Sequence, residues 1–124
     1  MSKFVRVQTE LRDVSLVKRS LDELKLVWRA DQTYKHRYSG ASQQAALVVD
    51  APGAYFGLRS SADGPLEVMG DDMQMVEVRR VLGRVTQRYA YHRVIEETGN
   101  AGFVLVDETT GKDGVIRMTV RKWG

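Results

Sequence analysis

The chain has 124 residues, of which 43% are hydrophobic and 28% charged, so it can fold as one globular domain over residues 1–124 without a disulfide or metal. It contains no cysteine, which excludes disulfide frameworks, thiolate metal sites and a cysteine nucleophile. The formal net charge of +3 gives only a mild preference for anionic partners and falls well short of a polybasic tail.

The N-terminal residues show neither a signal peptide nor a membrane span. Residues 1–7 alternate between polar and apolar side chains rather than forming an apolar block, unlike a signal peptide. No apolar run approaches the roughly 20 residues that a helix needs to cross a bilayer. We therefore expect a soluble protein of the cytoplasm, or of the equivalent space in an organelle, with no membrane partner.

The first elements are a strand and an amphipathic helix. Residues 4–11 are rich in β-forming side chains with partial alternation, which predicts a strand. Asp13 is placed to cap a helix over residues 14–25, because its carboxylate can accept from the amides of the first turn. Apolar residues at spacings of three and four predict one buried helix face, which consists of Val14, Val17, Leu21 and Leu24.

The middle of the chain predicts strands joined by short turns. Residues 26–30 predict a strand, and residues 45–49, 54–59 and 66–69 predict three more. The turn-forming residues between these three favour antiparallel hairpins, and so a meander. The polar segment 31–44 is either a loop or an exposed edge strand. An edge strand would pair easily with another chain, which leaves a homodimer open.

A second helix follows the meander. Asp71 with Gln74 resembles a capping box at its start, and Gly99 can supply the stop. The expected buried face consists of Met75, Val78, Leu82, Val85 and Tyr89.

The chain ends in a predicted hairpin of two strands, residues 103–107 and 115–121. The whole order is strand, helix, several strands, helix and two strands. It predicts an α+β fold in which two helices cover one face of a mainly antiparallel sheet. A ferredoxin-like core with an inserted meander is one topology that fits this order.

Catalytic, metal and cofactor signatures are absent from the sequence. Neither glycine-rich phosphate loops nor the GxSxG and HExxH motifs occur. The adjacent carboxylates Asp71 and Asp72 sit at a predicted helix end, where capping explains them. His36 lies in a polar stretch, and the sequence places no serine or acid to form a triad with His92. We therefore predict no catalytic residue, no metal site, no cofactor and no enzyme activity.

One row of basic residues stands out on the second helix. The planar guanidinium groups of arginines can donate paired hydrogen bonds to phosphates, and Tyr91, which lies near the row, could stack on a nucleobase. Acidic residues at both ends of the row would offset its charge. The row is either a solvated helix face, a contact for an anion or nucleic acid, or a protein interface; it consists of Arg80, Arg84, Arg88 and His92.

Trp123 is the second candidate for an interface. It follows a short basic cluster near the end of the chain. A tryptophan in that position either packs over the end of the sheet or is exposed as an interface anchor, a role that Tyr91 could share.

Several short segments together match a known sequence pattern: Thr86–Tyr91 (TQRYAY), Gly102–Phe103, Asp113–Arg117 and Trp123, with residues 2–4 and 8–13. In these segments the sequence resembles an uncharacterised family of small reading frames from algal plastid genomes and cyanobacteria, with relatives in other bacteria, described as a domain of unknown function. The resemblance implies no catalytic residues. Some bacterial relatives are encoded beside ATPases of the AAA+ class, which implies an adaptor or a subunit of a complex.

These observations favour one function and leave two alternatives. The missing catalytic chemistry and the family resemblance favour a non-enzymatic accessory or adaptor protein that binds another protein, with an AAA+ ATPase as the implied partner. The first alternative is a nucleic-acid-binding module that uses the basic row, and such binding would weaken steeply with salt. The second is an enzyme whose site is not recognisable in the sequence or is shared between subunits.

Overall fold

The computed structural model describes residues 2–62 and 64–122. It forms two compact units, Met1–Thr86 and Gln87–Gly124, whose boundary falls inside the long second helix. A single domain over the whole chain stays a prediction.

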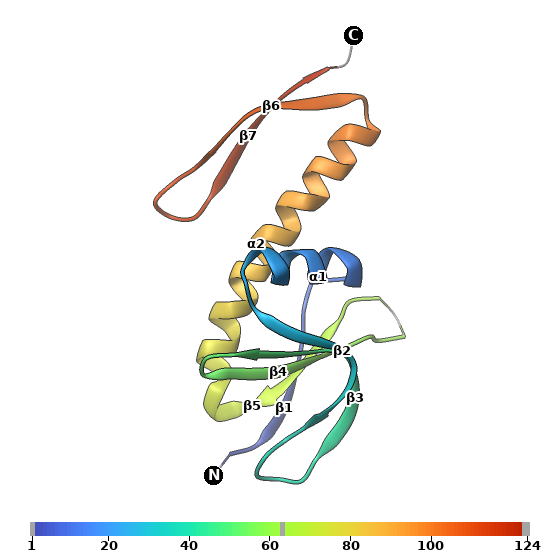
Figure 1. The fold of residues 1–124 in the computed structure, drawn as a ribbon, viewed down its shortest axis with the longest axis vertical. Helices are drawn as coiled ribbons and strands as arrows, with labels where there is room; N and C mark the ends of the chain where they lie inside the picture. The colour runs from blue at the N-terminus through green and yellow to red at the C-terminus, as the bar shows by residue number, and fades with distance from the viewer. Residues whose placement is uncertain (1, 63, 123–124) are drawn as a thin grey trace. The chain divides into compact units, whose positions relative to one another are not determined.

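The first unit is built on a five-stranded sheet with the order β1-β5-β4-β3-β2, in which every neighbouring pair is antiparallel (Figure 1). This confirms the α+β class and the central meander. The sheet differs from a ferredoxin-like core, which contains a parallel pair, because β1 pairs antiparallel with β5. The elements are β1 (Phe4–Gln8), α1 (Val14–Glu23), β2 (Val27–Lys35), β3 (Ser42–Ala51), β4 (Ala54–Arg59), β5 (Glu67–Asp71), the 3₁₀ turn η1 (Asp72–Gln74) and the start of α2 (Met75–Asn100).

Helix α1 begins and packs as the sequence predicts. The Asp13 carboxylate accepts hydrogen bonds from the amides of Ser15 at 3.0 Å and Leu16 at 3.3 Å, which caps the first turn. Val17 and Leu21 are fully buried on the apolar face. The helix ends at Glu23, and Lys25 follows in the left-handed region with φ of 58°.

Both helices contact the same face of the sheet. On the α1 side, the Trp28 indole Nε1 donates to Asp22 at 2.7 Å, and Trp28 lies opposite Val49 in the sheet. Val49 lies opposite Phe56 on the next strand. A Cβ atom on Gly70 would lie 3.5 Å from Met75 of α2 and 3.8 Å from Phe56. We call this side of the sheet the helix face, and the other side the concave face.

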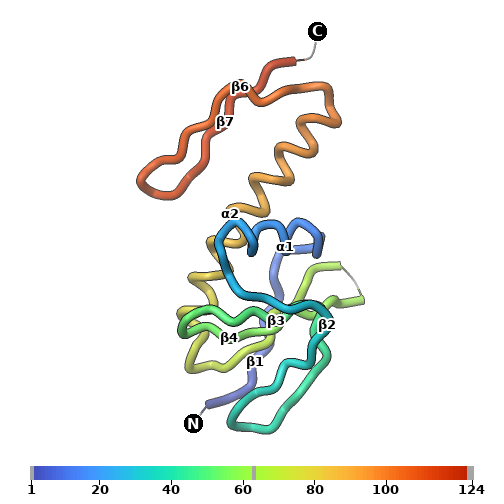
Figure 2. The backbone as a smooth tube through the Cα atoms, viewed as in Figure 1, coloured from blue at the N-terminus to red at the C-terminus, as the bar shows by residue number. Residues whose placement is uncertain are grey.

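The segment 31–44, for which the sequence left a loop or an edge strand open, contains both. β2 continues to Lys35 at the edge of the sheet, and β3 begins at Ser42. The turn between them is closed by the amide of His36, which donates to the Ala41 carbonyl at 2.8 Å. Figure 2 traces this long hairpin in teal and green out to its turn.

The sheet curls so that its two outer strands approach each other across the concave face. The ring of Phe4 on β1 stacks on Tyr34 of β2, with 6.0 Å between ring centroids, and lies 6.1 Å from the His36 ring. Phe4 and Tyr55 pack against a small buried cluster of Tyr34, Ala45, Val48 and Met69. The concave face therefore has its own apolar core, separate from the one under the helices.

The start of α2 differs in one detail from the predicted capping box. Asp71 caps the turn, since its Oδ1 accepts from the Met73 amide at 3.0 Å. Gln74 does not reach back to Asp71. Its side-chain oxygen accepts from the main-chain amide of Tyr55 at 3.1 Å. Along the helix Val78, Val81, Val85 and Tyr89 are buried. Val81 is therefore buried where the spacing predicts Leu82, which is only half-buried.

The second unit contains the end of α2 and a two-stranded antiparallel sheet of β6 (Phe103–Thr110) and β7 (Ile116–Lys122). This confirms the predicted hairpin and lengthens its first strand. The pairing shifts between Leu105 and Asp107, which leaves Val106 as a bulge. Ile116 and Met118 are half-buried while residues 115, 117 and 119 are exposed, which is the alternation of a strand, although Val120 on the same face is exposed.

Gly57 is where the concave core is tightest. A Cβ atom there would lie 3.1 Å from the Tyr34 Cβ and 3.2 Å from the end of Met69. We expect Gly57→Ala to lower the free energy of unfolding by about 1–3 kcal/mol, because the Tyr34 Cβ is fixed to the backbone of β2 and cannot retreat. Urea denaturation followed by circular dichroism measures the change.

The matched control is Gly83→Ala in α2. A Cβ atom at Gly83 has no neighbour within 4 Å, so alanine should raise the free energy of unfolding by about 0.5–1 kcal/mol through its helix propensity. Equal effects of the two variants would contradict the tight packing at Gly57.

Candidate functional site: a cleft on the concave face

A cleft of about 610 Å³ lies in the first unit, where the curled sheet leaves its concave face open. Its size falls within the range of pockets that hold small molecules or side chains of a partner. The walls come from β2, the hairpin turn, β3, β4, β5 and η1. They are lined by Ser2, Tyr34, Lys35, His36, Arg37, Tyr38, Asp50, Tyr55, Asp71, Met73 and Gln74.

His36 and Asp71 are buried polar residues of this cleft, and His36 has an exposed fraction of 3%. Its Nδ1 accepts a hydrogen bond from the Ser39 amide at 3.0 Å, and the Ser39 hydroxyl lies 2.6 Å from the same nitrogen. Because a main-chain N–H can only donate, Nδ1 is the acceptor, and we infer that the ring proton is on Nε2. The turn therefore fixes the tautomer of the imidazole as well as its orientation.

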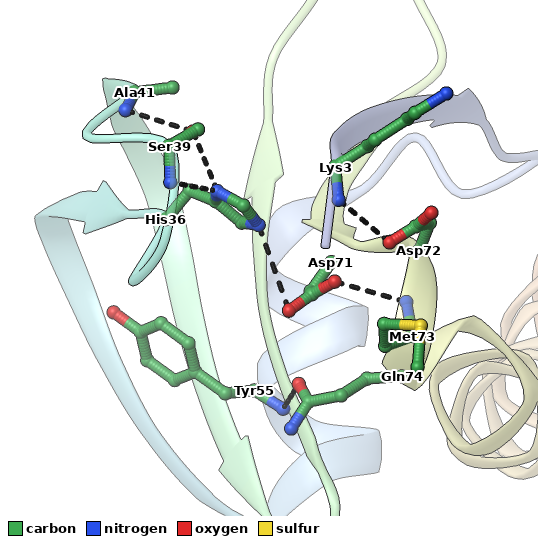
Figure 3. A network of polar contacts seen from close by, with 9 residues as sticks. All are labelled: Lys3, His36, Ser39, Ala41, Tyr55, Asp71, Asp72, Met73 and Gln74. Carbon is green, nitrogen blue, oxygen red and sulfur yellow. Dashed lines mark hydrogen bonds and ion pairs between the residues drawn. The ribbon is translucent and has the colours of Figure 1, made fainter. Parts of the chain in front are cut away.

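Asp71 faces the other side of this imidazole (Figure 3). Its Oδ1 accepts from Met73, while its Oδ2 lies 3.7 Å from His36 Nε2. That separation is too long for a hydrogen bond. Among the described residues no atom accepts from Nε2. A buried donor and a carboxylate oxygen thus face each other in the cleft without bonding directly.

Tyrosine rings form the rest of the wall. Tyr34 and Tyr55 are stacked, with 5.1 Å between centroids and 22° between planes. Tyr38 meets the His36 ring edge-on at 6.2 Å, and 69% of Tyr38 is exposed. The cleft therefore has a fixed pair of rings inside and one exposed ring at its rim.

Two ionisable groups, Tyr34 in the cleft and Asp72 next to its lining, have displaced pKa values. Burial, followed by the nearby Tyr55 and Asp71, raises the pKa of Tyr34 from 10.0 to about 12. The main-chain amide of Lys3 donates to Asp72 at 2.7 Å and lowers the pKa of that exposed carboxyl. Tyr34 therefore stays protonated where an ordinary tyrosine ionises, and Asp72 stays charged at lower pH.

The series Ser39, His36 and Asp71 has the composition of a hydrolytic triad but not its arrangement. Ser39 does not line the cleft. The Ser39 amide donates to Nδ1 of His36, and the Ser39 hydroxyl also lies beside this nitrogen. The same hydroxyl accepts from the Ala41 amide at 3.1 Å. These are the bonds of a hairpin turn, and the 3.7 Å gap to Asp71 leaves the imidazole without the partner that would orient a base. The arrangement suits binding better than nucleophilic catalysis.

Within the described ranges, 2–62 and 64–122, no group of three or more His, Asp or Glu side chains is arranged to hold a metal ion. Nor is any helix there both long and apolar enough to cross a membrane.

The basic row predicted on α2 begins with two exposed arginines. Arg80 pairs with Glu77 at 2.8 Å, one of the acidic neighbours expected to offset the charge. Arg84 is exposed. A spacing of four residues advances about 40° beyond each full turn of a helix, so such a row gradually leaves the face on which it starts.

The remaining members lie in the second unit. The Arg88 guanidinium lies over the Tyr91 ring, 4.5 Å from its centroid. His92 is 6% exposed and meets the edge of the Tyr91 ring at 5.3 Å. The structure therefore brings Arg88, Tyr91 and His92 together but buries the histidine. The predicted interface residue Trp123 lies outside the described residues.

The sequence did not single out the residues that form the cleft. Sequence spacing predicts Asp71 only as a helix cap and places His36 in a polar stretch. One feature of the sequence could have indicated the cleft. Aromatic rings recur at every second residue, as on one side of a strand, in Tyr34, His36 and Tyr38.

Comparison with known proteins places the chain in a family. Residues 20–119 match the family described as "Protein of unknown function (DUF1257)". The chain belongs to this family. The DUF1257 match runs from the end of α1 into β7, and so includes both His36 and Asp71.

Similar proteins from plastid-bearing algae extend the match to the whole length. The chain is 28% identical to the "Uncharacterized protein ycf35" of Guillardia theta and 27% identical to that of Pyropia yezoensis, with 99% of this chain and 98% of each relative covered. The protein of the same name from Cyanophora paradoxa is 28% identical over the same shares. No solved structure matches the chain. The resemblance noted from the sequence is thereby confirmed.

The raised pKa of Tyr34 predicts how stability depends on pH. Unfolded Tyr34 ionises near 10.0 and the folded residue at about 12, so its stabilising contribution is complete below pH 10 and is lost as the pH rises towards 12. The free energy of unfolding should fall less steeply over this range in Tyr34→Phe than in the wild type. Urea denaturation at a series of alkaline pH values measures both slopes.

The control is Tyr38→Phe, which removes a hydroxyl from an exposed ring and should keep the wild-type slope. A wild-type slope in Tyr34→Phe as well would show that Tyr34 does not hold its proton as described.

Proposed function

We propose that this protein is a non-enzymatic accessory protein of the cytoplasm that binds an extended segment of another protein in the concave cleft. The partner implied by the family resemblance is an ATPase of the AAA+ class. The observation that carries the proposal is the cleft itself, which combines a stacked tyrosine pair, an exposed tyrosine and a buried polar pair. Tyrosine is enriched in protein interfaces because its ring is large and rigid and its hydroxyl can bond.

The length of the groove supports an extended occupant. A second hollow of about 220 Å³ adjoins the cleft and shares Asp50 and Tyr55 with it. This hollow continues along β2 to Val27, which is 61% exposed. A groove that follows an edge strand fits a stretch of polypeptide, which can present alternate side chains to successive hollows.

The charges at the groove support a protein partner over a nucleic acid. Lys35 and Arg37 line the cleft together with Asp50 and Asp71, so the site lacks the single positive sign that phosphate binding requires. Binding of nucleic acid by Arg80, Arg84, Arg88 and His92 is the second hypothesis. It rests on the exposed arginines Arg80 and Arg84 and loses support from the burial of His92.

A tagged pull-down from native lysate at low and high salt tests both hypotheses. We expect an AAA+ ATPase to remain bound at high salt, because the proposed contact relies on tyrosine packing and hydrogen bonds rather than on phosphate charge. Tyr38→Ser should reduce its recovery several-fold, since it removes an exposed ring from the rim without touching the core. Mass spectrometry and nucleic-acid staining of the eluates identify what is retained.

Arg84→Glu is the matched control, because it changes an exposed residue on α2 away from the cleft and should leave protein recovery unchanged. Retention of RNA or DNA that is lost with salt and with Arg84→Glu would favour the nucleic-acid hypothesis. Recovery of the ATPase unaffected by Tyr38→Ser would contradict binding through the cleft.

A further inference from the structure

The polar pair inside the cleft limits what a partner can insert there. His36 Nε2 offers a donor, Asp71 Oδ2 offers an acceptor, and 3.7 Å separates them. An oxygen atom placed about 2.8 Å from both, an ordinary hydrogen-bond length, fits across this gap with an angle of about 83° at the oxygen. One atom can therefore bond both groups without either side chain moving.

We propose that the pair receives the hydroxyl of a serine or threonine from the bound segment, an inference that rests on the proposed function. The hydroxyl accepts from His36 Nε2 and donates its own proton to Asp71 Oδ2. It is the short side-chain group that does both through a single atom.

Other side-chain groups fail at one of the two contacts. A carboxylate accepts from Nε2 but has no proton for Asp71 and repels its charge. An ammonium donates to Asp71 but cannot accept from Nε2. An apolar side chain satisfies neither group and leaves a buried donor without an acceptor.

Both halves of the pair are held in place before a ligand arrives. The Ser39 amide bonds Nδ1 of His36 at 3.0 Å, and the Met73 amide bonds Oδ1 of Asp71 at 3.0 Å. Each side chain thus uses one polar atom to anchor itself to main chain and presents the other to the cleft (Figure 3). Such preorganisation lowers the cost of binding.

Access to Nε2 requires a neighbouring ring to move, because the nitrogen is buried. Tyr38 meets the imidazole edge-on and is 69% exposed, whereas Phe4, the other ring beside it, packs against the buried cluster. Tyr38 is therefore the ring that we expect to move aside when the hydroxyl enters.

Selection of random peptides displayed on phage against the purified full-length protein tests this inference. We expect the selected peptides to share a serine or threonine. Its replacement by alanine in a synthetic peptide should weaken binding about tenfold or more in fluorescence anisotropy, since the buried pair then loses its partner.

The decisive variant is Asp71→Asn. Asparagine caps a helical turn as well as aspartate does, so the bond to Met73 is kept while an amide N–H₂ replaces the acceptor that faces His36. The pair then offers two donors, and the preference for serine or threonine over alanine should disappear in favour of side chains that only accept. Glu67→Gln, a change elsewhere on β5 and outside the cleft lining, is the control and should keep the wild-type preference.

The outcomes distinguish the hydroxyl pocket from the binding of an extended segment, on which it rests. Peptides that bind without a hydroxyl preference, or a preference that survives Asp71→Asn, would overturn the hydroxyl pocket and leave the proposed function standing. Failure of the wild type to select any peptide would overturn binding of an extended segment, and the hydroxyl pocket with it.

Discussion

The curl of the five-stranded sheet is the constraint on which the rest of the first unit depends. Helices α1 and α2 pack on one face, so the other face must be protected from water by the sheet itself. It is protected because the outer strands bend towards each other until Phe4 of β1 meets Tyr34 of β2 at 6.0 Å. Gly57 permits this closeness, since its missing side chain leaves room for the base of Tyr34. The cleft is the part of the concave face that the curl leaves open.

The same constraint explains why polar groups are buried at the mouth of the cleft. The hairpin turn after β2 carries His36 across to the end of β5, where Asp71 already has to cap the turn into α2. The two oxygens of Asp71 therefore have different neighbours: Oδ1 caps the turn into α2, and Oδ2 faces His36. Gln74 links the same turn to Tyr55 of β4, so the start of α2 is tied to the wall of the cleft. A ligand that engages Asp71 would act on a residue that also fixes a helix terminus.

Local patterns in the sequence predicted the elements well and the site poorly, for physical reasons. Asp13, the apolar face of α1 and the turn residues between β3, β4 and β5 act through neighbours in the chain, so their spacing revealed them. The cleft depends on pairs such as His36 with Asp71 and Phe4 with Tyr34, which are far apart in sequence and meet only through the curl. The side chain of Gln74 had a local role available at the helix start, yet the fold uses it for a long-range bond to Tyr55. On α2, regular spacing suggested a solvated basic row, but the spacing alone could not show that His92 is buried.

The central claim is that His36 presents a donor to the cleft because the Ser39 amide occupies its other nitrogen. Long-range proton–nitrogen correlation NMR of the His36 ring at neutral pH tests it most directly, because the spectrum distinguishes a protonated ring nitrogen from one that accepts a hydrogen bond. The account predicts a proton on Nε2 and an unprotonated, hydrogen-bonded Nδ1. A proton on Nδ1 would contradict it, since the imidazole would then face Asp71 with a lone pair and could not donate to a bound hydroxyl.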